Sequence, residues 1–375
     1  WSLTSDDGIN MLNPGDTPHE NIQFLLVLAC ILKAVDKHAD LLRESAACVG
    51  NEHRLGAHEA PPAIISVFLG EQLEDVIDQL CSTGEATHSL QGGILKTGVT
   101  TLPDFEKDAT DRNRTSPFAF TNNKFEFRMV GSSDSIASPN IVLNTIVAES
   151  FKEAANELEK ADDFDEAVHN MIKKLFINHR RIIFNGNGYS DEWVKEAKRR
   201  GLSNLPSMVD AIPALVYDSS VKLFEEFEVF TRKELESRVE IEYEAYSKAI
   251  NIEAKAMIDI AGKSIIPAVI RYTTRLADSV IKLKKAMEGI EPYAQCSILS
   301  EVNDHLKESK LALENLKKYM DDVSVITDVT EHARYMHEVI VPAMEALRKP
   351  IDTLEMIVDK DLWPMPSYGD LLFEV

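Results

Sequence analysis

Charged and apolar residues alternate strictly in the segment KFEFRMV at residues 124–130. This alternation predicts a β-strand, because successive side chains of a strand point to opposite faces. Lys124, Glu126 and Arg128 would share one face of that strand. In a central strand such a charged row is costly to remove from water, unless it binds ions or a charged ligand. In an edge strand the same row would be an ordinary solvated face.

Two upstream loops carry further candidates for binding anions. Arg112 and Arg114 lie two residues apart in DRNRTSPF, and a guanidinium fork can bind phosphate or carboxylate through two hydrogen bonds. A surface ion pair with Asp111 is the commoner explanation of such a pair. The loop NEHRLGAHEAPP adds Arg54 and Glu59, although it could simply be a connection that caps a helix. The sequence contains no Walker A, G-x-G-x-x-G, G-x-S-x-G or H-E-x-x-H pattern.

Composition narrows the class of protein. The chain has 375 residues, a mass of 42.0 kDa and a net charge of −22, so two or three domains are expected and general nucleic-acid binding is disfavoured. No run of about 18 uncharged apolar residues predicts a membrane span, and no signal peptide is visible. Four widely spaced cysteines indicate reduced thiols and a cytoplasmic location. Because WSLT resembles the interior of a strand and lacks a preceding Met, we expect a segment of a longer chain.

Helical spacing dominates most of the sequence. Thr17, Pro18 and Glu20 predict a helix start, followed by a helix that is apolar nearly all round. Residues 45–62 and 82–122 are predicted to be loops. Further helices are expected at residues 66–81, 140–160, 164–184 and 191–200.

Beyond about residue 230 the pattern predicts a bundle of long antiparallel helices. Thr231 and Glu234 form a capping box at its start. Pro267 and Pro342 should break or kink their helices. The aromatic, proline-rich tail LWPMPSYGDLLFEV is expected to dock on a surface rather than extend a helix.

The runs NEHRLGAHEAPPAI, RNRTSPF and KFEFRMVGSSDSIASPNIVLNTIVAES together resemble the C-terminal catalytic region of glutamine synthetases of the large type III branch. The segment RRIIFNGNGYSDEWVKEAKRRGL and the tail extend this resemblance over the whole chain. It implies an α+β fold: part of an antiparallel sheet with flanking helices, followed by a long helical bundle. The implied domains are the end of the catalytic domain at 1–160, its helical extension at 161–230, the bundle at 231–358 and a docking tail at 359–375.

The resemblance also implies roles for individual residues. Arg54 would hold the substrate glutamate, and Glu59 would close the site and help deprotonate ammonium. Arg114 would bind the ATP phosphates and the transferring phosphoryl group. Glu126 would be a ligand of a divalent metal, and Arg128 would contact glutamate and the phosphoryl group.

Lys124 and Ser2 would lie near the nucleotide. Two departures from the family pattern stand out: Ala119 occupies the position of a family arginine, and the loop between Arg54 and Glu59 is one residue shorter than the bacterial form. The implied co-substrate is ATP and the implied metal is Mg²⁺ or Mn²⁺. The implied partners are glutamate, ammonium and further copies of the chain in a ring-type homo-oligomer, a dodecamer by resemblance.

The chemistry of amide formation agrees with these roles. A carboxylate oxygen becomes a leaving group when ATP phosphorylates it, and this transfer depends on metals and cationic side chains around the phosphoryl group. The leading hypothesis is therefore an ATP-dependent glutamate–ammonia ligase that makes glutamine through γ-glutamyl phosphate. The alternatives are a ligase for another amine and a non-catalytic scaffold of the same fold. Most family metal ligands are expected upstream of Trp1, so this segment alone should be inactive.

Overall fold

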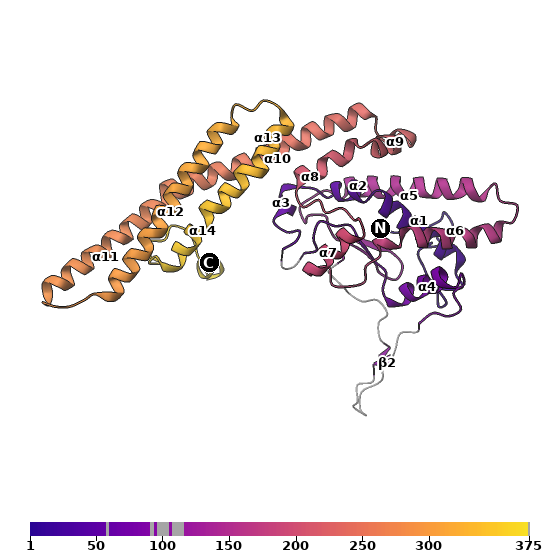
Figure 1. Ribbon diagram of the computed structural model, residues 1–375, viewed down its shortest axis with the longest axis horizontal. Helices are drawn as coiled ribbons and strands as arrows, with labels where there is room; N and C mark the ends of the chain where they lie inside the picture. The colour runs from indigo at the N-terminus through magenta and orange to yellow at the C-terminus, as the bar shows by residue number, and fades with distance from the viewer. Residues whose placement is uncertain (58–59, 91–93, 96–104, 107–115, 374–375) are drawn as a thin grey trace. The chain divides into compact units, whose positions relative to one another are not determined.

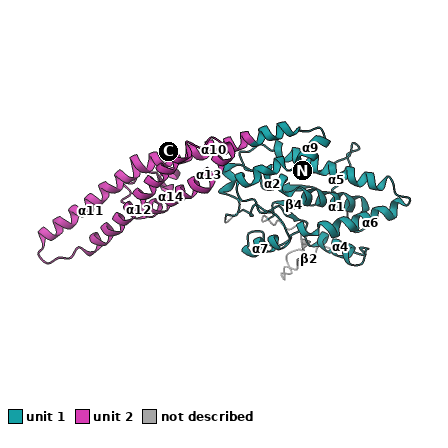
Figure 2. Cartoon of the chain, turned by 45° about the horizontal axis from the view of Figure 1, so that its top comes forward, with its two compact units in different colours: residues 1–239 teal, residues 240–375 magenta. Residues whose placement is uncertain are grey.

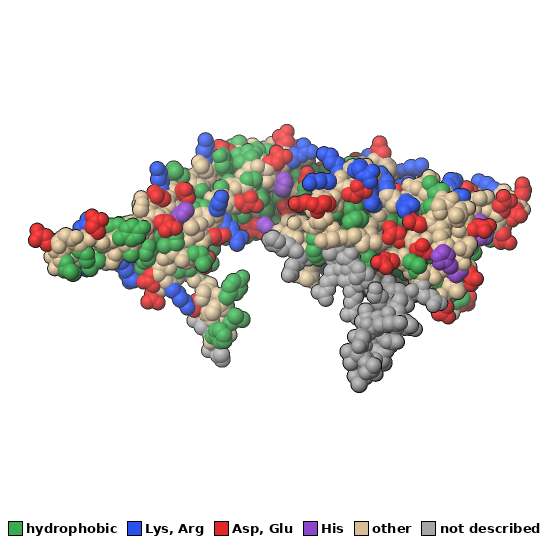
Figure 3. Space-filling view, turned by 60° about the horizontal axis from the view of Figure 1, so that its bottom comes forward, with side chains coloured by type: hydrophobic (Ala, Val, Ile, Leu, Met, Phe, Trp, Pro, Cys, Tyr) green, Lys and Arg blue, Asp and Glu red, His purple; other side chains and the backbone are tan. Residues whose placement is uncertain are grey.

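The computed structural model describes residues 1–57, 60–90, 94–95, 105–106 and 116–373. It is mostly helical, with a small mixed sheet (Figure 1). The chain divides into two compact units, unit 1 at Trp1–Val239 and unit 2 at Glu240–Val375 (Figure 2). Acidic and basic side chains are interspersed on the face drawn in Figure 3. None of the helices in the described ranges has the length and apolar character needed to cross a membrane.

Unit 1 combines most of the short elements. Its helices are α1 (Ile22–Lys37), α2 (Ala39–Glu44), α3 (Val49–Glu52), α4 (Glu71–Ser82), α5 (Ala137–Leu158), α6 (Phe164–His179), α7 (Asp191–Arg199), α8 (Met208–Ala211) and α9 (Asp218–Glu226), with 3₁₀ turns at Arg180–Ile182 and Ile212–Val216. Its strands are β1 (Val67–Phe68), β2 (Ile94–Leu95), β3 (Phe105–Glu106), β4 (Phe118–Phe120) and β5 (Phe125–Phe127). Helix α10 (Arg232–Ile260) begins in unit 1 and continues into unit 2.

The predicted antiparallel sheet is correct only in part. The order is β1-β4-β5, in which β4 and β5 are antiparallel but β1 and β4 are parallel, with Val67 opposite Phe118. The long connection from β1 to β4, which contains α4, permits parallel pairing. Strands β2 and β3 form a separate antiparallel pair.

Helix α1 is buried nearly all round, as its sequence predicts. Phe24, Leu28 and Ile31 are each at most 1% exposed. The predicted helix start at Thr17 is wrong. Asn21 is the N-cap instead, because its side-chain oxygen accepts a hydrogen bond from the Phe24 amide at 3.0 Å.

The predicted helix at 66–81 begins later than expected. Residues 67–68 form β1, and Gly70 separates this strand from α4 with a φ of +84°. That left-handed conformation is readily adopted by glycine. Strand β1 is short and completely buried, so its sequence resembles the apolar face of a helix.

A charged cluster ties α1 to α5 in unit 1. Glu149 on α5 lies 2.7 Å from His38 Nε2 and 2.8 Å from Lys37 Nζ. Burial by itself raises the pKa of Glu149, but hydrogen bonds from His38 and Lys37 outweigh it and lower the pKa from 4.5 to about 2. The carboxylate therefore stabilises the fold at pH values above about 4.5, and this contribution is lost as the pH falls through about 2.

We expect Glu149→Gln to lower the free energy of unfolding at pH 7 by about 1–2 kcal/mol. The loss is smaller than for a fully buried ion pair, because solvent partly screens this cluster. Urea unfolding at several pH values measures the difference from the wild type, which should shrink between pH 4.5 and 2. Glu157→Gln is the matched control: Glu157 also lies on α5 and pairs with a lysine, Lys174 of α6, but its side chain is 59% exposed. A difference that stayed constant with pH would contradict this account.

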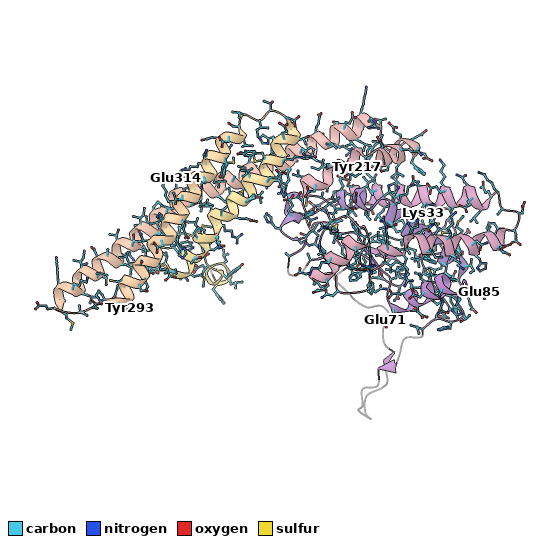
Figure 4. All side chains as sticks on the ribbon, viewed as in Figure 1. Lys33, Glu71, Glu85, Tyr217, Tyr293 and Glu314 are labelled. Atoms are coloured by element: carbon cyan, nitrogen blue, oxygen red, sulfur yellow. The ribbon has the colours of Figure 1, made fainter. Side chains whose placement is uncertain are left out.

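Unit 2 consists of long helices. After α10 they are α11 (Ile266–Ala286), α12 (Tyr293–Val323), α13 (Val329–Tyr335), α14 (Val341–Ile357) and α15 (Tyr368–Phe373). Figure 4 labels Tyr293 at the start of α12 and Glu314 further along it. The predicted capping box of α10 is confirmed, because the Thr231 amide donates to Glu234 Oε2 at 2.8 Å.

A π-helical turn precedes each of the two prolines that were predicted to interrupt a helix. The turn at Ala261–Ile265 precedes Pro267, and the turn at Met336–Ile340 precedes Pro342. Proline lacks an amide hydrogen and crowds the preceding turn, and a wider turn accommodates both effects.

As predicted, the tail does not extend α14, which ends at Ile357. Leu362 and Trp363 pack against a core cluster of unit 2. Helix α15 is a separate short helix, on which Leu372 is 73% exposed.

Candidate functional site

Aromatic packing fixes the orientation of β5. Phe125 is fully buried, and its ring stacks on Phe118 with centroids 4.6 Å apart and planes 8° apart. The residues between the aromatic side chains must therefore face the other way. Met129 continues the buried side beyond the strand. The predicted alternation is confirmed, although the strand itself covers only Phe125–Phe127.

Glu126 and Arg128 pair with each other on the charged side of β5. Arg128 Nη2 and Nε donate to Glu126 Oε2 at 2.9 and 3.1 Å. The Glu126 side chain is 43% exposed and that of Arg128 is 23% exposed. Both groups can therefore be reached by a ligand, and neither bears the desolvation cost of a fully buried charge.

Backbone pairing protects the outer edge of β5. The Trp1 backbone nitrogen donates to the Phe125 carbonyl at 2.8 Å, and the Phe125 amide donates to the Trp1 carbonyl at 2.9 Å. Strand β5 therefore has a bonded neighbour on each side, β4 on one and Trp1 on the other. Within the named sheet β5 is nevertheless the end strand, and Lys124 on its charged face is exposed, as the alternative interpretation expects; Trp1 covers its edge only at Phe125. Because Ser2 follows Trp1 directly, the pairing also brings Ser2 close to β5.

Arg54 lies beside the end of β5. It follows the short helix α3, and its Nη2 donates to the Arg128 carbonyl at 2.9 Å. Its Nη1 donates to the Met129 carbonyl at 3.2 Å. The structure therefore brings together Arg54 and Arg128, two predicted substrate-binding residues that are far apart in sequence.

Asn51 is a residue of this site that the sequence analysis missed. It is 2% exposed, and its Nδ2 donates to the carbonyls of Ala46 and Met129 at 2.8 and 2.9 Å. It therefore holds the α3 segment against the chain that leaves β5. Its position three residues before Arg54 was the one feature of the sequence that could have pointed to it. Its hydrogen-bond partners depend on tertiary contacts that the sequence does not reveal.

The remaining predicted site residues fall into two groups. Lys124 and Ser2 are described, and both are exposed. Arg112, Arg114 and Glu59 lie outside the described residues. The structure therefore bears on the predicted convergence of these side chains only through Arg54, the charged face of β5 and Ser2.

The site offers one carboxylate for a divalent metal. Oxygen ligands suit Mg²⁺ and Mn²⁺, and the exposed carboxylate of Glu126 has this chemistry. Among the described residues no group of three or more His, Cys, Asp or Glu side chains could hold a metal ion. Glu126 therefore fits the role of a single ligand, and the described residues do not form a complete site.

Comparison with known proteins gives the class. A family model described as the glutamine synthetase C-terminal domain matches residues 167–284. Similarity to curated glutamine synthetases covers the whole chain, with its charged strand and Arg54 loop included. The chain is therefore similar to glutamine synthetases over its whole length, and residues 167–284 match their C-terminal domain.

Three relatives define the similarity more closely. The chain is 43% identical to the type-3 glutamine synthetase of Dictyostelium discoideum over its whole length and 52% of that protein. It is 37% identical to a glutamine synthetase of Butyrivibrio fibrisolvens and 36% identical to one of Bacteroides fragilis (strain YCH46), covering all of this chain and 53% and 52% of those proteins. The chain thus spans about half the length of the curated relatives it matches.

Proposed function

We propose that this chain supplies part of the active site of an ATP-dependent glutamate–ammonia ligase. The observation that carries the proposal is the cluster of Arg54, Arg128 and Glu126, in which two cations and one carboxylate share an accessible surface beside β5. Similarity to glutamine synthetases over the whole chain supports the same assignment. Because the described residues offer one candidate metal ligand, we propose that this segment is inactive by itself.

The first chemical step is a phosphoryl transfer. A γ-carboxylate oxygen of glutamate attacks the γ-phosphorus of ATP, the bond to the bridging oxygen breaks, and ADP leaves with the electron pair. Arg128 and Arg114 neutralise charge on the moving phosphoryl group, while Arg54 holds the glutamate. Lys124 and Ser2 contact the nucleotide. A divalent metal held in part by Glu126 would add further charge neutralisation.

The second step forms the amide. Ammonia attacks the acyl carbon of γ-glutamyl phosphate, the carbon–oxygen bond breaks, and phosphate leaves with its electron pair. Glu59 accepts a proton from the incoming nitrogen and closes the loop over the intermediate. Excluding water matters here because water would hydrolyse the acyl phosphate. The active form is proposed to be a ring-type homo-oligomer.

We expect Glu59→Ala in the full-length assembled protein to slow amide formation by about 10²- to 10⁴-fold, the usual cost of losing a general base. The affinity for ATP should change less than about twofold. Glutamine production and nucleotide binding are measured separately. Ammonium is compared with a panel of amines in the same assay. A loss of ATP binding in the variant would contradict the loop role, and no preference for ammonium would contradict the choice of substrate.

A further inference from the structure

A cavity of about 730 Å³ lies entirely within unit 2. Residues of α10, the C-terminal end of α12 and the segment leading into α13 line it. Its apolar wall includes Ile258, Met320, Val323, Val329 and Met336. The volume is in the range of small-molecule sites, which are mostly apolar with a few polar groups that fix orientation.

One buried polar group in this cavity lacks a partner. Ser247 lines the cavity and is 7% exposed, and its Oγ has no hydrogen-bond partner among the described residues. A buried hydroxyl without a partner has lost its hydrogen bonds to water without gaining one in the protein, which is unfavourable. Asn251 lies one helical turn further along α10 and lines the same cavity. A ligand that hydrogen-bonds here would remove the cost at Ser247.

Burial favours the neutral form of the histidine in the cavity wall. Burial lowers the pKa of His332, which lines the cavity near the start of α13. The wall is therefore suited to an apolar body. The charged groups of the cavity are lysine and carboxylate side chains.

Lysines dominate the remaining charges around the cavity. Lys248 is paired with Glu244 at 2.6 Å. Lys255 and Lys317 also line the cavity, are exposed, and make no ion pair within the described part of the chain. Asp321 is the one other carboxylate in the lining. Two unpaired lysines against one carboxylate leave a locally cationic site on a chain whose net charge is −22.

We propose that this cavity binds a small amphiphilic carboxylate, with its apolar body against the wall and its carboxylate toward Lys255 and Lys317. The site shares no residue with the proposed ligase site. It therefore adds a binding function to the helical unit, for which the ligase assignment gives no role.

Isothermal titration of the full-length assembled protein with decanoate tests this proposal. We expect saturable binding of one decanoate per chain, and weaker binding of decanol, which has the same apolar body without the charge. The double substitution Lys255→Gln with Lys317→Gln should raise the Kd about fivefold, the loss expected for two solvent-exposed ion pairs. Lys307→Gln with Lys318→Gln is the matched control, because it removes two exposed α12 lysines that do not line the cavity.

A second variant keeps the test independent of charge. Thr327→Trp places a large side chain at an exposed lining position, so it should abolish decanoate binding while circular dichroism shows the helices intact. Binding that neither variant changes would overturn the proposal. Equal affinity for decanol would also overturn it. So would binding that appears only after the assembly is dissociated, because the cavity would then be a contact surface between copies.

Discussion

Glu126→Ala in the full-length assembled protein is expected to reduce metal-dependent glutamine formation by about 10²- to 10³-fold, the range for losing one group that stabilises charge in the transition state. The Glu126 side chain is 43% exposed, so its removal should change the free energy of unfolding by less than about 1 kcal/mol. The loss should therefore appear in turnover and in metal affinity, and size-exclusion chromatography should show the assembly unchanged.

Two comparisons make this result specific. Glu126→Gln retains the shape of the side chain but not its charge, so it should resemble Glu126→Ala in metal affinity. Glu159→Ala removes another exposed carboxylate of unit 1, at the C-cap of α5, and should leave turnover unchanged. If Glu126→Ala kept wild-type turnover, the metal-ligand role would be wrong.

The second large effect is expected from Arg54→Lys. The Arg54 guanidinium donates to the carbonyls of Arg128 and Met129 at 2.9 and 3.2 Å, and a lysine ammonium cannot reproduce this fork. The cation would then no longer be fixed beside Arg128, and the KM for glutamate should rise about ten- to a hundredfold, the effect of losing one or two charge-assisted hydrogen bonds to the substrate. The KM for ATP should change little, because the proposed role of Arg54 concerns the amino-acid substrate.

Arg199→Lys is the matched control for this change. Arg199 is also an exposed arginine of unit 1, with a side chain 76% exposed and paired to Glu196. It lies on α7 and has no proposed role in the site, so its replacement should leave both KM values unchanged. An Arg54→Lys variant whose kcat fell while the KM for glutamate stayed constant would contradict a substrate-holding role.

Local features of the fold were predictable where the chemistry involves neighbours in sequence. The Thr231–Glu234 capping box, the alternation around Phe125 and the interruption before Pro267 all depend on residues within a few positions. The start of α1 was mispredicted because Thr17 and Asn21 are both good N-caps. Only the folded loop shows that Asn21 accepts the hydrogen bond from the first turn.

Long-range features could not be predicted in the same way. The parallel pairing of β1 with β4 joins segments about fifty residues apart. The pairing of Trp1 with Phe125 spans 124 residues. Neither leaves a local signature, since a two-residue buried strand carries no periodicity that separates it from a helix.

For the candidate site, residue types suggested anion binding, and the family resemblance supplied the roles. The structure places the Arg54 side chain against the backbone carbonyl of Arg128. It also identifies Asn51, whose buried side chain holds this arrangement. No sequence pattern could have revealed that contact, because the same residue in an open loop would be an ordinary polar side chain. The catalytic and binding roles of all the predicted site residues, Glu59 and Arg114 included, are predictions.

Isotope transfer tests the central claim most directly. Glutamate labelled with ¹⁸O in its γ-carboxylate is incubated with ATP, ammonium and Mg²⁺ and the full-length assembled protein, and the inorganic phosphate is analysed by mass spectrometry. If γ-glutamyl phosphate forms at this site, each glutamine made should release one phosphate carrying one carboxylate oxygen, and Glu126→Ala should suppress label and product together. Phosphate released without the label while glutamine accumulates would contradict the account.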